Sequence, residues 1–313
     1  MPRPVKDGSV SVGGRTVPVS SLDKPFFPDA GLTKGDLLAY YRDVAEVMLP
    51  HLRGRPINLQ RFPNGIDGHG FWQQGVADHF PDWVRTVTVE RRGRGGTVDH
   101  VVVDHPATVV YLANLATVTF HAWTSTVDHL ARPDLVILDL DPDPGQGLEE
   151  VRAAARAVRR ACEEVGLTAF VQTSGSKGYH VVMPLRPGPD VEVVRDFAAE
   201  LAALVAARDP GHLTVEWRKA KRQGRLLLDT ARNGYAQTLV APYSVRPRPE
   251  APVATPIDWA ELGRAEPRSY TMTNLRRRLA RKPDPWAGMA AQAADFDPVR
   301  SRLDELLAES GGR

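Results

Sequence analysis

The residues of this chain that are best suited to chemistry are two aspartates at the end of an apolar run. Residues 135–138 are Leu-Val-Ile-Leu, and Asp139, Leu140 and Asp141 follow. On a strand, side chains two residues apart point to the same face, so the two carboxylates would lie side by side. Two anions this close repel each other, and a divalent metal with oxygen ligands suits the space between them. The alternative is an Asp-rich turn without a ligand, since residues 142–145 are Pro-Asp-Pro-Gly.

A second polar element is the turn that contains Ser174, Gly175, Ser176, Lys177 and Gly178. Glycine lets backbone amides approach an anion, and lysine adds a point charge, so the composition suits a phosphate. The turn is not a P-loop, because its residue spacing differs and because a hairpin is expected instead of a helix after it. A polar hairpin turn without a ligand is the alternative.

A third carboxylate, Asp229, also closes an apolar run, the three leucines 226–228. Three carboxylates can hold two divalent ions about 3.5–4 Å apart, an arrangement that activates an attacking 3′-hydroxyl and neutralises a triphosphate. Arg232 and Arg246 are candidates for the remaining phosphate charge, or for surface ion pairs. His121 follows an apolar stretch, where a core histidine with a satisfied hydrogen bond is the default interpretation.

Elements of the first part of the chain follow from local signals. Residues 10–19 alternate around Gly13 and predict a hairpin. Thr33 and Asp36 predict the start of a helix that Pro50 would end. Residues 84–89 and 97–103 predict a hairpin with a basic tip, whereas residues 109–120 are compatible with either helix or strand.

From Leu135 onward the predicted order is strand, helix, two strands, helix and further strands, which is the split βαβ unit of ferredoxin-like folds. In that unit the first strand lies antiparallel beside the third, which would bring Asp139 and Asp141 close to the turn at 174–178. The pattern leaves open whether Asp229 lies on the fourth strand or on a later one.

Composition excludes some classes of protein. The chain has 313 residues, 42% of them hydrophobic and 25% charged, as in ordinary globular proteins. No apolar run approaches the ~20 residues that span a bilayer, and the N-terminus lacks the apolar core of a secretion signal. Cys162 is the only cysteine, which excludes an internal disulfide and indicates a small core residue and a reducing, cytoplasmic location.

Basic clusters are candidate contacts to a nucleic-acid backbone, although solvated loops are their commoner role. They are Arg91-Arg92-Gly93-Arg94, the run from Arg218 to Arg225, and Arg276-Arg277-Arg278.

Taken together, these motifs resemble the archaeo-eukaryotic primase superfamily and, more narrowly, the polymerase domain of bacterial ligase D, the multifunctional end-joining ligase. The resemblance runs from about Ser20 to Trp286. It rests on the ordered motifs Leu22-Asp-Lys-Pro-Phe-Phe-Pro28, Thr33-Lys-Gly-Asp36, Arg61-Phe-Pro-Asn-Gly65, Asp139-x-Asp141, Ser174-Gly-Ser-Lys-Gly-Tyr-His180, Asp229 with its flanking residues, and Lys282-Pro-Asp-Pro-Trp286.

The resemblance implies a role for each matching residue. Asp139, Asp141 and Asp229 match metal-binding catalytic carboxylates that hold two Mn2+ (or Mg2+) ions. The residues that match nucleotide contacts are His121, Ser174, Lys177, His180 and Arg246, with Phe71 and Trp72 as an aromatic pair that stacks on the base. Lys24 and Lys34 match lysines that bind a DNA 5′-phosphate. The family often has Asn where this chain has Ser21, and it tends to prefer ribonucleotides and manganese.

The fold that we expect is α/β (α+β), a primase-polymerase fold with a ferredoxin-like mixed catalytic sheet packed against an N-terminal α/β subdomain. The expected boundaries are 1–130 for the N-terminal subdomain, 131–290 for the catalytic subdomain and 291–313 for a C-terminal helix or tail. The two subdomains are expected to close one central cleft and to act as one polymerase domain.

The leading hypothesis is a template-directed, metal-dependent nucleotidyltransferase that adds nucleotides to a DNA 3′ end in gap filling or non-homologous end joining. Its expected partners are gapped or broken duplex DNA, nucleoside triphosphates, a separate DNA ligase and the end-binding protein Ku, with no membrane, in a bacterial nucleoid. Two alternatives stay open. One is a phosphohydrolase with Asp139 as the nucleophile, which requires a doubly wound parallel sheet. The other is a non-catalytic module that binds DNA ends, which leaves the acidic residues unexplained.

Overall fold

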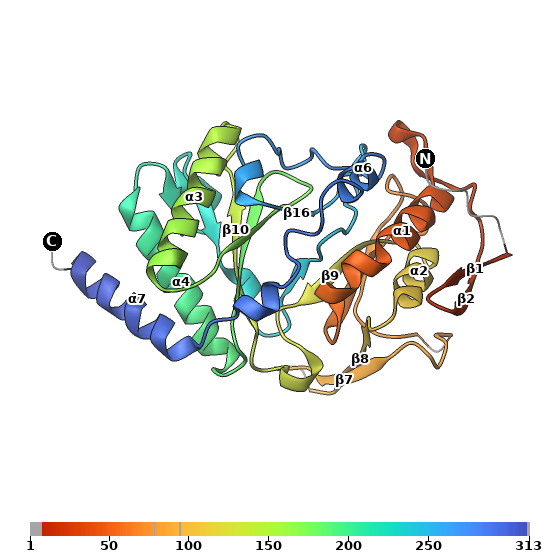
Figure 1. The fold of residues 1–313 in the computed structure, drawn as a ribbon, viewed down its shortest axis with the longest axis horizontal. Helices are drawn as coiled ribbons and strands as arrows, with labels where there is room; N and C mark the ends of the chain where they lie inside the picture. Colours follow the sequence, from red (N-terminus) through yellow and green to blue (C-terminus); the bar gives the residue numbers. More distant parts are fainter. Residues whose placement is uncertain (1–7, 78, 94, 312–313) are drawn as a thin grey trace. The chain divides into compact units, whose positions relative to one another are not determined.

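The computed structural model describes residues 8–77, 79–93 and 95–311. The chain forms two compact units and passes between them several times (Figure 1). Unit 1 contains the chain up to Asp128 together with Thr238–Thr255 and Tyr270–Pro283. Unit 2 contains His129–Gln237, Pro256–Ser269 and the chain from Asp284 onward.

Unit 1 is built on an antiparallel sheet in the order β15-β9-β5-β8-β7, with the short strand β6 also paired to β5. Its strands are β5 (Pro56–Arg61), β6 (Phe71–Gln73), β7 (Thr86–Glu90), β8 (Thr97–Val102), β9 (Thr117–Trp123) and β15 (Thr238–Val240). Helices α1 (Lys34–Leu52) and α2 (Pro106–Asn114) pack against each other (Figure 1). Two small hairpins complete the unit: β1 (Gly8–Val12) with β2 (Arg15–Val19), and β3 (Pro25–Phe27) with β4 (Leu32–Thr33).

Local signals placed most of these elements correctly. The hairpin around Gly13 is confirmed, as is the basic-tipped hairpin β7–β8, although its Arg94 lies outside the described residues. The capping box is also present: the Thr33 amide donates to Asp36 Oδ2 at 2.8 Å, and the Asp36 amide donates to Thr33 Oγ1 at 3.2 Å. Residues 109–120 contain both alternatives, the end of α2 and the start of β9.

The prediction that Pro50 ends the first helix is wrong, because α1 continues to Leu52. A proline removes only its own amide donor, and later amides still reach helical acceptors. The Arg53 amide donates to Leu49 O at 2.9 Å, so the last turn closes around Pro50.

Unit 2 is built on a six-stranded sheet in the order β13-β14-β10-β12-β11-β16. Its strands are β10 (Leu135–Asp141), β11 (Phe170–Thr173), β12 (Tyr179–Pro184), β13 (Leu213–Thr214), β14 (Leu226–Asp229) and β16 (Thr255–Ile257). The central order β14-β10-β12-β11, antiparallel throughout, is that of the predicted ferredoxin-like unit, and Asp229 lies on its fourth strand. The phosphohydrolase alternative requires a doubly wound parallel sheet, whereas both neighbours of β10 are antiparallel to it.

Helices α3 (Leu148–Glu164) and α4 (Val191–Arg208) contact this sheet and each other. The apolar face of α3 includes Cys162, which is fully buried, and burial raises the pKa of its thiol to about 12. Cys162 is therefore the core residue that the sequence predicts.

The remaining helices lie in the connections between these elements or, in the case of α7, near the end of the chain. The α-helices among them are α5 (Lys219–Arg222), α6 (Leu275–Leu279) and α7 (Phe296–Gly311). The 3-10 helices are η1 (Pro28–Ala30), η2 (Val127–His129), η3 (Ala231–Asn233), η4 (Trp259–Glu261) and η5 (Met289–Gln292).

The predicted boundary at residue 130 lies close to the end of the first segment of unit 1 at Asp128. The later segments Thr238–Thr255 and Tyr270–Pro283, which fall within the predicted catalytic subdomain, pack in unit 1. One reason is backbone pairing, since β15 extends the sheet of unit 1 through its ladder with β9.

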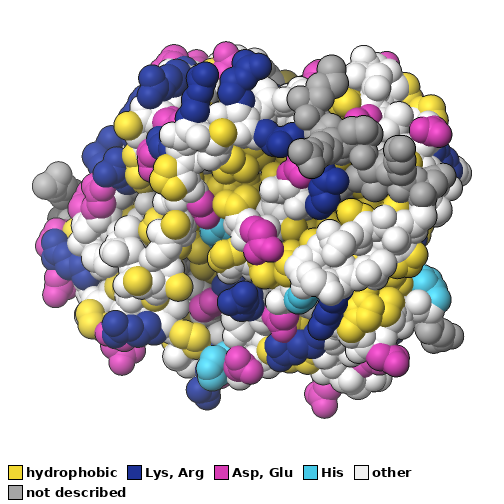
Figure 2. All heavy atoms as spheres, turned by 45° about the vertical axis from the view of Figure 1, so that its right-hand side comes forward, with side chains coloured by type: hydrophobic (Ala, Val, Ile, Leu, Met, Phe, Trp, Pro, Cys, Tyr) yellow, Lys and Arg dark blue, Asp and Glu magenta, His cyan; other side chains and the backbone are white. Residues whose placement is uncertain are grey.

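The surface carries charges of both signs. Figure 2 shows acidic and basic side chains interspersed on one face, in line with a net charge of +2. No helix among the described residues is both long and apolar enough to cross a membrane.

A side chain completes the backbone pairing of the central strand β10. The buried amide of Asn233 receives a hydrogen bond from the Ile137 backbone N at 2.8 Å and donates one to Ile137 O at 2.7 Å. The backbone pairing between β10 and β14 ends at Asp139 and Asp229. Beyond this pair, the side chain of Asn233 supplies the hydrogen bonds to β10.

We predict that Asn233→Ala lowers the free energy of unfolding by about 2–5 kcal/mol, because it leaves two buried backbone groups without partners. Urea unfolding followed by circular dichroism measures the change. The exposed Asn274 provides a matched control, and Asn274→Ala should cost less than about 1 kcal/mol. Equal effects of the two substitutions would show that Asn233 does not support β10.

Candidate active site

A row of polar residues crosses the sheet of unit 2. Asp139 on β10 is directly opposite Asp229 on β14 and His180 on β12, and His180 is opposite Gln172 on β11. Directly opposed residues point to the same face of a sheet, and so does Asp141, two positions from Asp139. The structure therefore places the three predicted carboxylates, which are far apart in the sequence, on one face.

Burial and charge act together on Asp229, which is 8% exposed. Burial raises the pKa of its carboxyl, and the nearby carboxylates Asp139 and Asp141 raise it further. The Ala231 amide, which donates to Asp229 Oδ1 at 2.8 Å, and the positive charge of Arg232 act in the opposite direction. Arg232, a predicted phosphate-binding residue, is thus close enough to affect this carboxylate.

A buried arginine holds the third carboxylate. Arg222 Nη1 donates to Asp141 Oδ2 at 3.0 Å, and the Arg222 side chain is 4% exposed. The same guanidinium donates to Glu216 O and Trp217 O, each at 3.2 Å. In the sequence, Arg222 is one residue of the basic run from Arg218 to Arg225, and nothing in that run distinguishes it from the exposed residues around it.

His180 lies beside Asp139, with Nε2 3.5 Å from Asp139 Oδ1. The other ring nitrogen, Nδ1, is 2.9 Å from Gln172 Nε2, so this hydrogen bond orients the ring. The sequence motifs did not identify Gln172 as a residue of the site either. The only signal for such a role is that Gln172 is a polar residue within a largely apolar strand.

The donor set suits a divalent cation, because carboxylate oxygens are the ligands that Mg2+ prefers and that manganese also accepts. In the described parts of the chain, however, no three His, Cys, Asp or Glu side chains are positioned to hold a metal ion as they stand. The ion pair between Arg222 and Asp141 is one physical reason. The residues therefore fit a metal in their chemistry, and Asp141 could offer a cation its second carboxylate oxygen or exchange its guanidinium partner.

The predicted phosphate-binding turn lies next to the acidic pair. A side-chain Cβ at Gly178 would come within 2.0 Å of Leu140 O, so only glycine permits this contact with the strand between Asp139 and Asp141. The buried Ser174 shapes the turn, since its Oγ accepts from the Ser176 amide at 3.1 Å and the Gly178 amide at 3.2 Å. Lys177 is exposed.

A hollow of about 320 Å3 lies beside this turn, and its lining includes Pro142, Lys177 and Arg268. Arg268 Nε donates to Ser176 O at 3.0 Å, which ties a second basic residue to the turn. The turn therefore offers positive charge next to free volume within unit 2.

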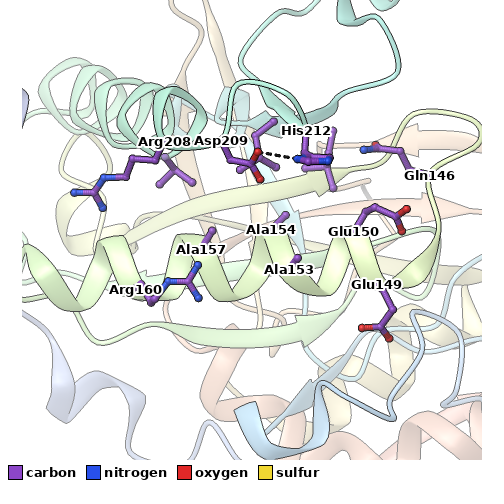
Figure 3. Close-up of a pocket in the computed structure, with 13 residues that line it drawn as sticks. Gln146, Glu149, Glu150, Ala153, Ala154, Ala157, Arg160, Arg208, Asp209 and His212 are labelled. Atoms are coloured by element: carbon purple, nitrogen blue, oxygen red, sulfur yellow. Dashed lines mark hydrogen bonds and ion pairs between the residues drawn. The ribbon is translucent and has the colours of Figure 1, made fainter. Parts of the chain in front are cut away.

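A second hollow, of about 570 Å3, lies beside α3 (Figure 3). Leu226 contributes to its lining, and strand alternation directs Leu226 away from the face that Asp229 occupies. Alanines of α3 line the hollow, and His212 at its rim pairs with Asp209 at 2.7 Å (Figure 3). This hollow is distinct from the acidic site.

The predicted aromatic pair lies in unit 1, on the edge strand β6. Trp72 is 54% exposed and packs edge-on against His121 at 4.7 Å between ring centroids. Phe71 is 39% exposed, and the guanidinium of Arg61 lies 5.3 Å from its ring centroid. Since neighbouring residues of a strand point to opposite faces, Trp72 shares a face with His121, whereas Phe71 does not.

Arg246 belongs to the same region of unit 1. It follows Val245, whose carbonyl accepts from Thr119 Oγ1 at 2.7 Å, two residues before His121 on β9. A buried tyrosine fixes this segment as well, since the Val245 amide donates to Tyr41 Oη at 3.0 Å. Burial raises the pKa of Tyr41, so its hydroxyl stays neutral.

The structure also brings together the two predicted 5′-phosphate lysines. The Lys34 amide donates to Lys24 O at 2.8 Å at the end of the β3–β4 hairpin. Lys24 Nζ donates to Pro63 O at 2.6 Å and to Asn64 Oδ1 at 2.8 Å, and Lys34 Nζ donates to Ser20 O at 2.7 Å. Lys34 is buried, and both lysine side chains are held by uncharged oxygens in these hydrogen bonds.

Ser21, three residues before Lys24, has a φ of +57°. This left-handed conformation is unfavourable for most residues, and Asn adopts it more readily than Ser. The backbone conformation at this position therefore favours Asn over Ser.

The comparisons with known proteins agree with this fold. The family model of the LigD primase-polymerase domain matches residues 33–286. The multifunctional non-homologous end joining protein LigD of Mycobacterium bovis is 33% identical over 305 residues, which cover 94% of this chain and 39% of that protein. The bifunctional non-homologous end joining protein LigD of Bacillus subtilis is 27% identical over 293 residues, covering 93% of this chain and 47% of that protein.

A solved structure, the polymerase domain of Mycobacterium tuberculosis ligase D in complex with DNA, matches with a TM-score of 0.82 and 31% identity. The match covers 88% of this chain and 99% of that chain. It confirms the α/β fold class and defines the protein as one of the primase-polymerase type. The chain belongs to the LigD primase-polymerase domain family, and it spans less than half the length of these LigD relatives.

We predict that Asp229→Asn stabilises the metal-free protein at neutral pH by on the order of 1 kcal/mol, because it removes a buried charge beside two like charges. The raised pKa of Asp229 means that the folded state binds its proton more tightly than the unfolded chain does. The contribution of Asp229 to stability therefore falls as pH rises from the ordinary value of 3.8 through the raised pKa.

Urea unfolding in EDTA at pH 4 and pH 7 measures this effect, and the advantage of the variant should grow between the two. Added Mn2+ should stabilise the wild type more than the variant, because a cation needs the carboxylate. A variant that is less stable than the wild type at pH 7 in EDTA would contradict the proposed repulsion.

Proposed function

We propose that this chain is a template-directed, metal-dependent nucleotidyltransferase that adds nucleotides, preferably ribonucleotides, to a DNA 3′ end. Its role would be gap filling or double-strand break repair by non-homologous end joining. The observation that carries the proposal is the alignment of Asp229, Asp139 and His180 across one sheet, with Asp141 on the same face. The names of the LigD relatives and the DNA in the solved neighbour support it.

In this proposal, Asp139, Asp141 and Asp229 hold two Mn2+ (or Mg2+) ions. Bound there, the cations would neutralise the triphosphate and lower the pKa of the attacking 3′-hydroxyl. Burial and acidic neighbours raise the pKa of Asp229, so an added positive charge would stabilise its charged form. Arg222 serves as the counter-charge of Asp141 before the cations bind.

Other residues of unit 2 would hold the incoming nucleotide. Lys177 and Arg232 neutralise phosphate oxygens, and the Ser174 hydroxyl donates to one of them while its oxygen keeps the turn in shape. His180, oriented by Gln172, contacts the nucleotide beside Asp139.

Residues of unit 1 would bind the base and the DNA. The exposed rings of Phe71 and Trp72 provide stacking surfaces, which accept any base and are worth roughly 1–3 kcal/mol each. His121, in contact with Trp72, and Arg246 complete the nucleotide contacts. Lys24 and Lys34 would bind the 5′-phosphate at a gap or recessed end.

The cellular setting follows from the activity. An enzyme that fills gaps at broken ends leaves a nick, so we propose that it works with a DNA ligase and with Ku, in the cytoplasm at the bacterial nucleoid. A module that binds DNA ends without catalysis would show DNA binding with neither metal dependence nor nucleotide incorporation.

We predict that the double variant Asp139→Ala, Asp141→Ala loses primer extension by at least about 10³-fold, because the cations lose most of their ligands. The assay is extension of a gapped duplex with Mn2+ and ribonucleotides. Asp143→Asn, in the turn just after the strand, is the matched control and should keep activity within about threefold. Undiminished extension by the double variant would exclude this mechanism.

We also predict that Lys24→Ala, Lys34→Ala abolishes the preference for gaps with a 5′-phosphate, since two cations at one corner are removed. The measurement is the ratio of extension rates on 5′-phosphorylated and 5′-hydroxyl gaps, which is insensitive to the fraction of folded enzyme. Arg195→Ala, on the surface of α4, should leave the ratio unchanged. A wild type that shows no preference would refute the assignment.

A further inference from the structure

An exposed tryptophan lies in the most basic segment of unit 2. Trp217 is 57% exposed and Val215 44% exposed, in the connection between β13 and α5. Single exposed apolar residues are common, but a mostly exposed indole beside several cations is a distinct surface. Neither the family motifs nor the site described above uses it.

The backbone under Trp217 is held in place. The buried Arg222 donates to both Glu216 O and Trp217 O, and the Arg218 amide donates to Glu216 Oε1 at 2.9 Å. The Glu216 amide in turn donates to Thr214 Oγ1 at 3.1 Å. The indole therefore projects from a fixed backbone, which lowers the entropy lost when a ligand stacks on it.

The same hydrogen bonds place this surface close to the acidic site. Arg222 contacts Trp217 O through Nη2 and Asp141 Oδ2 through Nη1. The Trp217 backbone is thus separated from a predicted metal-binding carboxylate by one guanidinium group.

The charge around the indole identifies the class of ligand. Arg218, Lys219 and Lys221 are exposed, and Glu216, which caps the Arg218 amide, is the only acidic residue between 215 and 225. A ligand that suits both features needs a chain of anions and accessible planar faces. Single-stranded nucleic acid has both, whereas the bases of a duplex are stacked on each other.

We propose that Trp217 stacks on an unpaired base of the single strand next to a DNA end, and that Lys219 and Lys221 contact the flanking phosphates. The inference adds a DNA contact to the proposed function and rests on that function having a gapped or broken DNA substrate. The contact would hold single-stranded DNA close to the acidic site, since the side chain of Arg222 joins the Trp217 backbone to Asp141.

The first test is binding of a 16-nucleotide oligo(dT) to the full chain, followed by fluorescence anisotropy of a labelled strand. Trp217→Ala should raise Kd about tenfold, and Trp217→Phe, which keeps an aromatic face, should stay within about threefold of wild type. Val193→Ala removes a comparably exposed apolar residue on α4 and should have no effect. Near-normal binding by Trp217→Phe would show that substitution at this position does not by itself disrupt folding.

The second test separates stacking from charge. Lys219→Ala, Lys221→Ala should reduce the slope of log Kd against log salt by about 1.4, or 0.7 for each lost phosphate contact on a single strand. Trp217→Ala should weaken binding without changing this slope. A double-stranded oligonucleotide of the same length should show little sensitivity to Trp217→Ala.

The outcomes distinguish this inference from the proposed function. Unchanged oligo(dT) binding by Trp217→Ala, while the wild type still extends a gapped primer, would overturn the role of Trp217 and leave the polymerase proposal standing. Equal losses for single- and double-stranded DNA would also overturn it. Weaker single-strand binding by Trp217→Ala, with no primer extension by the wild type, would support this surface and count against the polymerase.

Discussion

The antiparallel pairing of β10 with a strand on each side is the interaction on which the site depends. Its ladder with β14 forces Asp139 and Asp229 to the same face, and its ladder with β12 adds His180. Side by side, the carboxylates repel each other, and the backbone hydrogen bonds of three strands oppose that repulsion. Leu138 and Leu140 point to the opposite face, where they are buried, so one strand serves both the core and the site.

The surroundings of the carboxylates show how the protein tolerates this charge. Arg222 pairs with Asp141, the Ala231 amide supports Asp229, and His180 lies beside Asp139. Each partner is a group that a cation or a nucleotide could relieve or replace. The repulsion among the carboxylates is therefore opposed by several neighbours, and burial together with this repulsion raises the pKa of Asp229.

Periodicity and capping in the sequence predicted the elements that bear the site. The apolar run ending in Asp139 and Asp141 is β10, and the ferredoxin-like order was correct because its strands and helices have clear periods. Arg222 and Asn233 were missed because their roles depend on partners distant in sequence, Asp141 for Arg222 and Ile137 for Asn233. Gln172 was missed because its role depends on the pairing of two strands, which places it opposite His180. The sheet that β15 joins could not be inferred either, since a three-residue strand carries no information about its neighbour.

The interleaving of the two units has a consequence for translation. The hydroxyl of Tyr41 accepts from the Val245 amide, and 204 residues separate the two in the chain. A ribosome adding about 5–20 residues per second needs roughly 10–40 s to cover that interval. β9 is complete at Trp123 and β15 begins at Thr238, so for roughly 6–23 s of synthesis the nascent first unit lacks β15, and the edge of β9 that β15 later covers stays open. The order of synthesis thus exposes an unpaired strand edge early, when the new polypeptide is most vulnerable to aggregation.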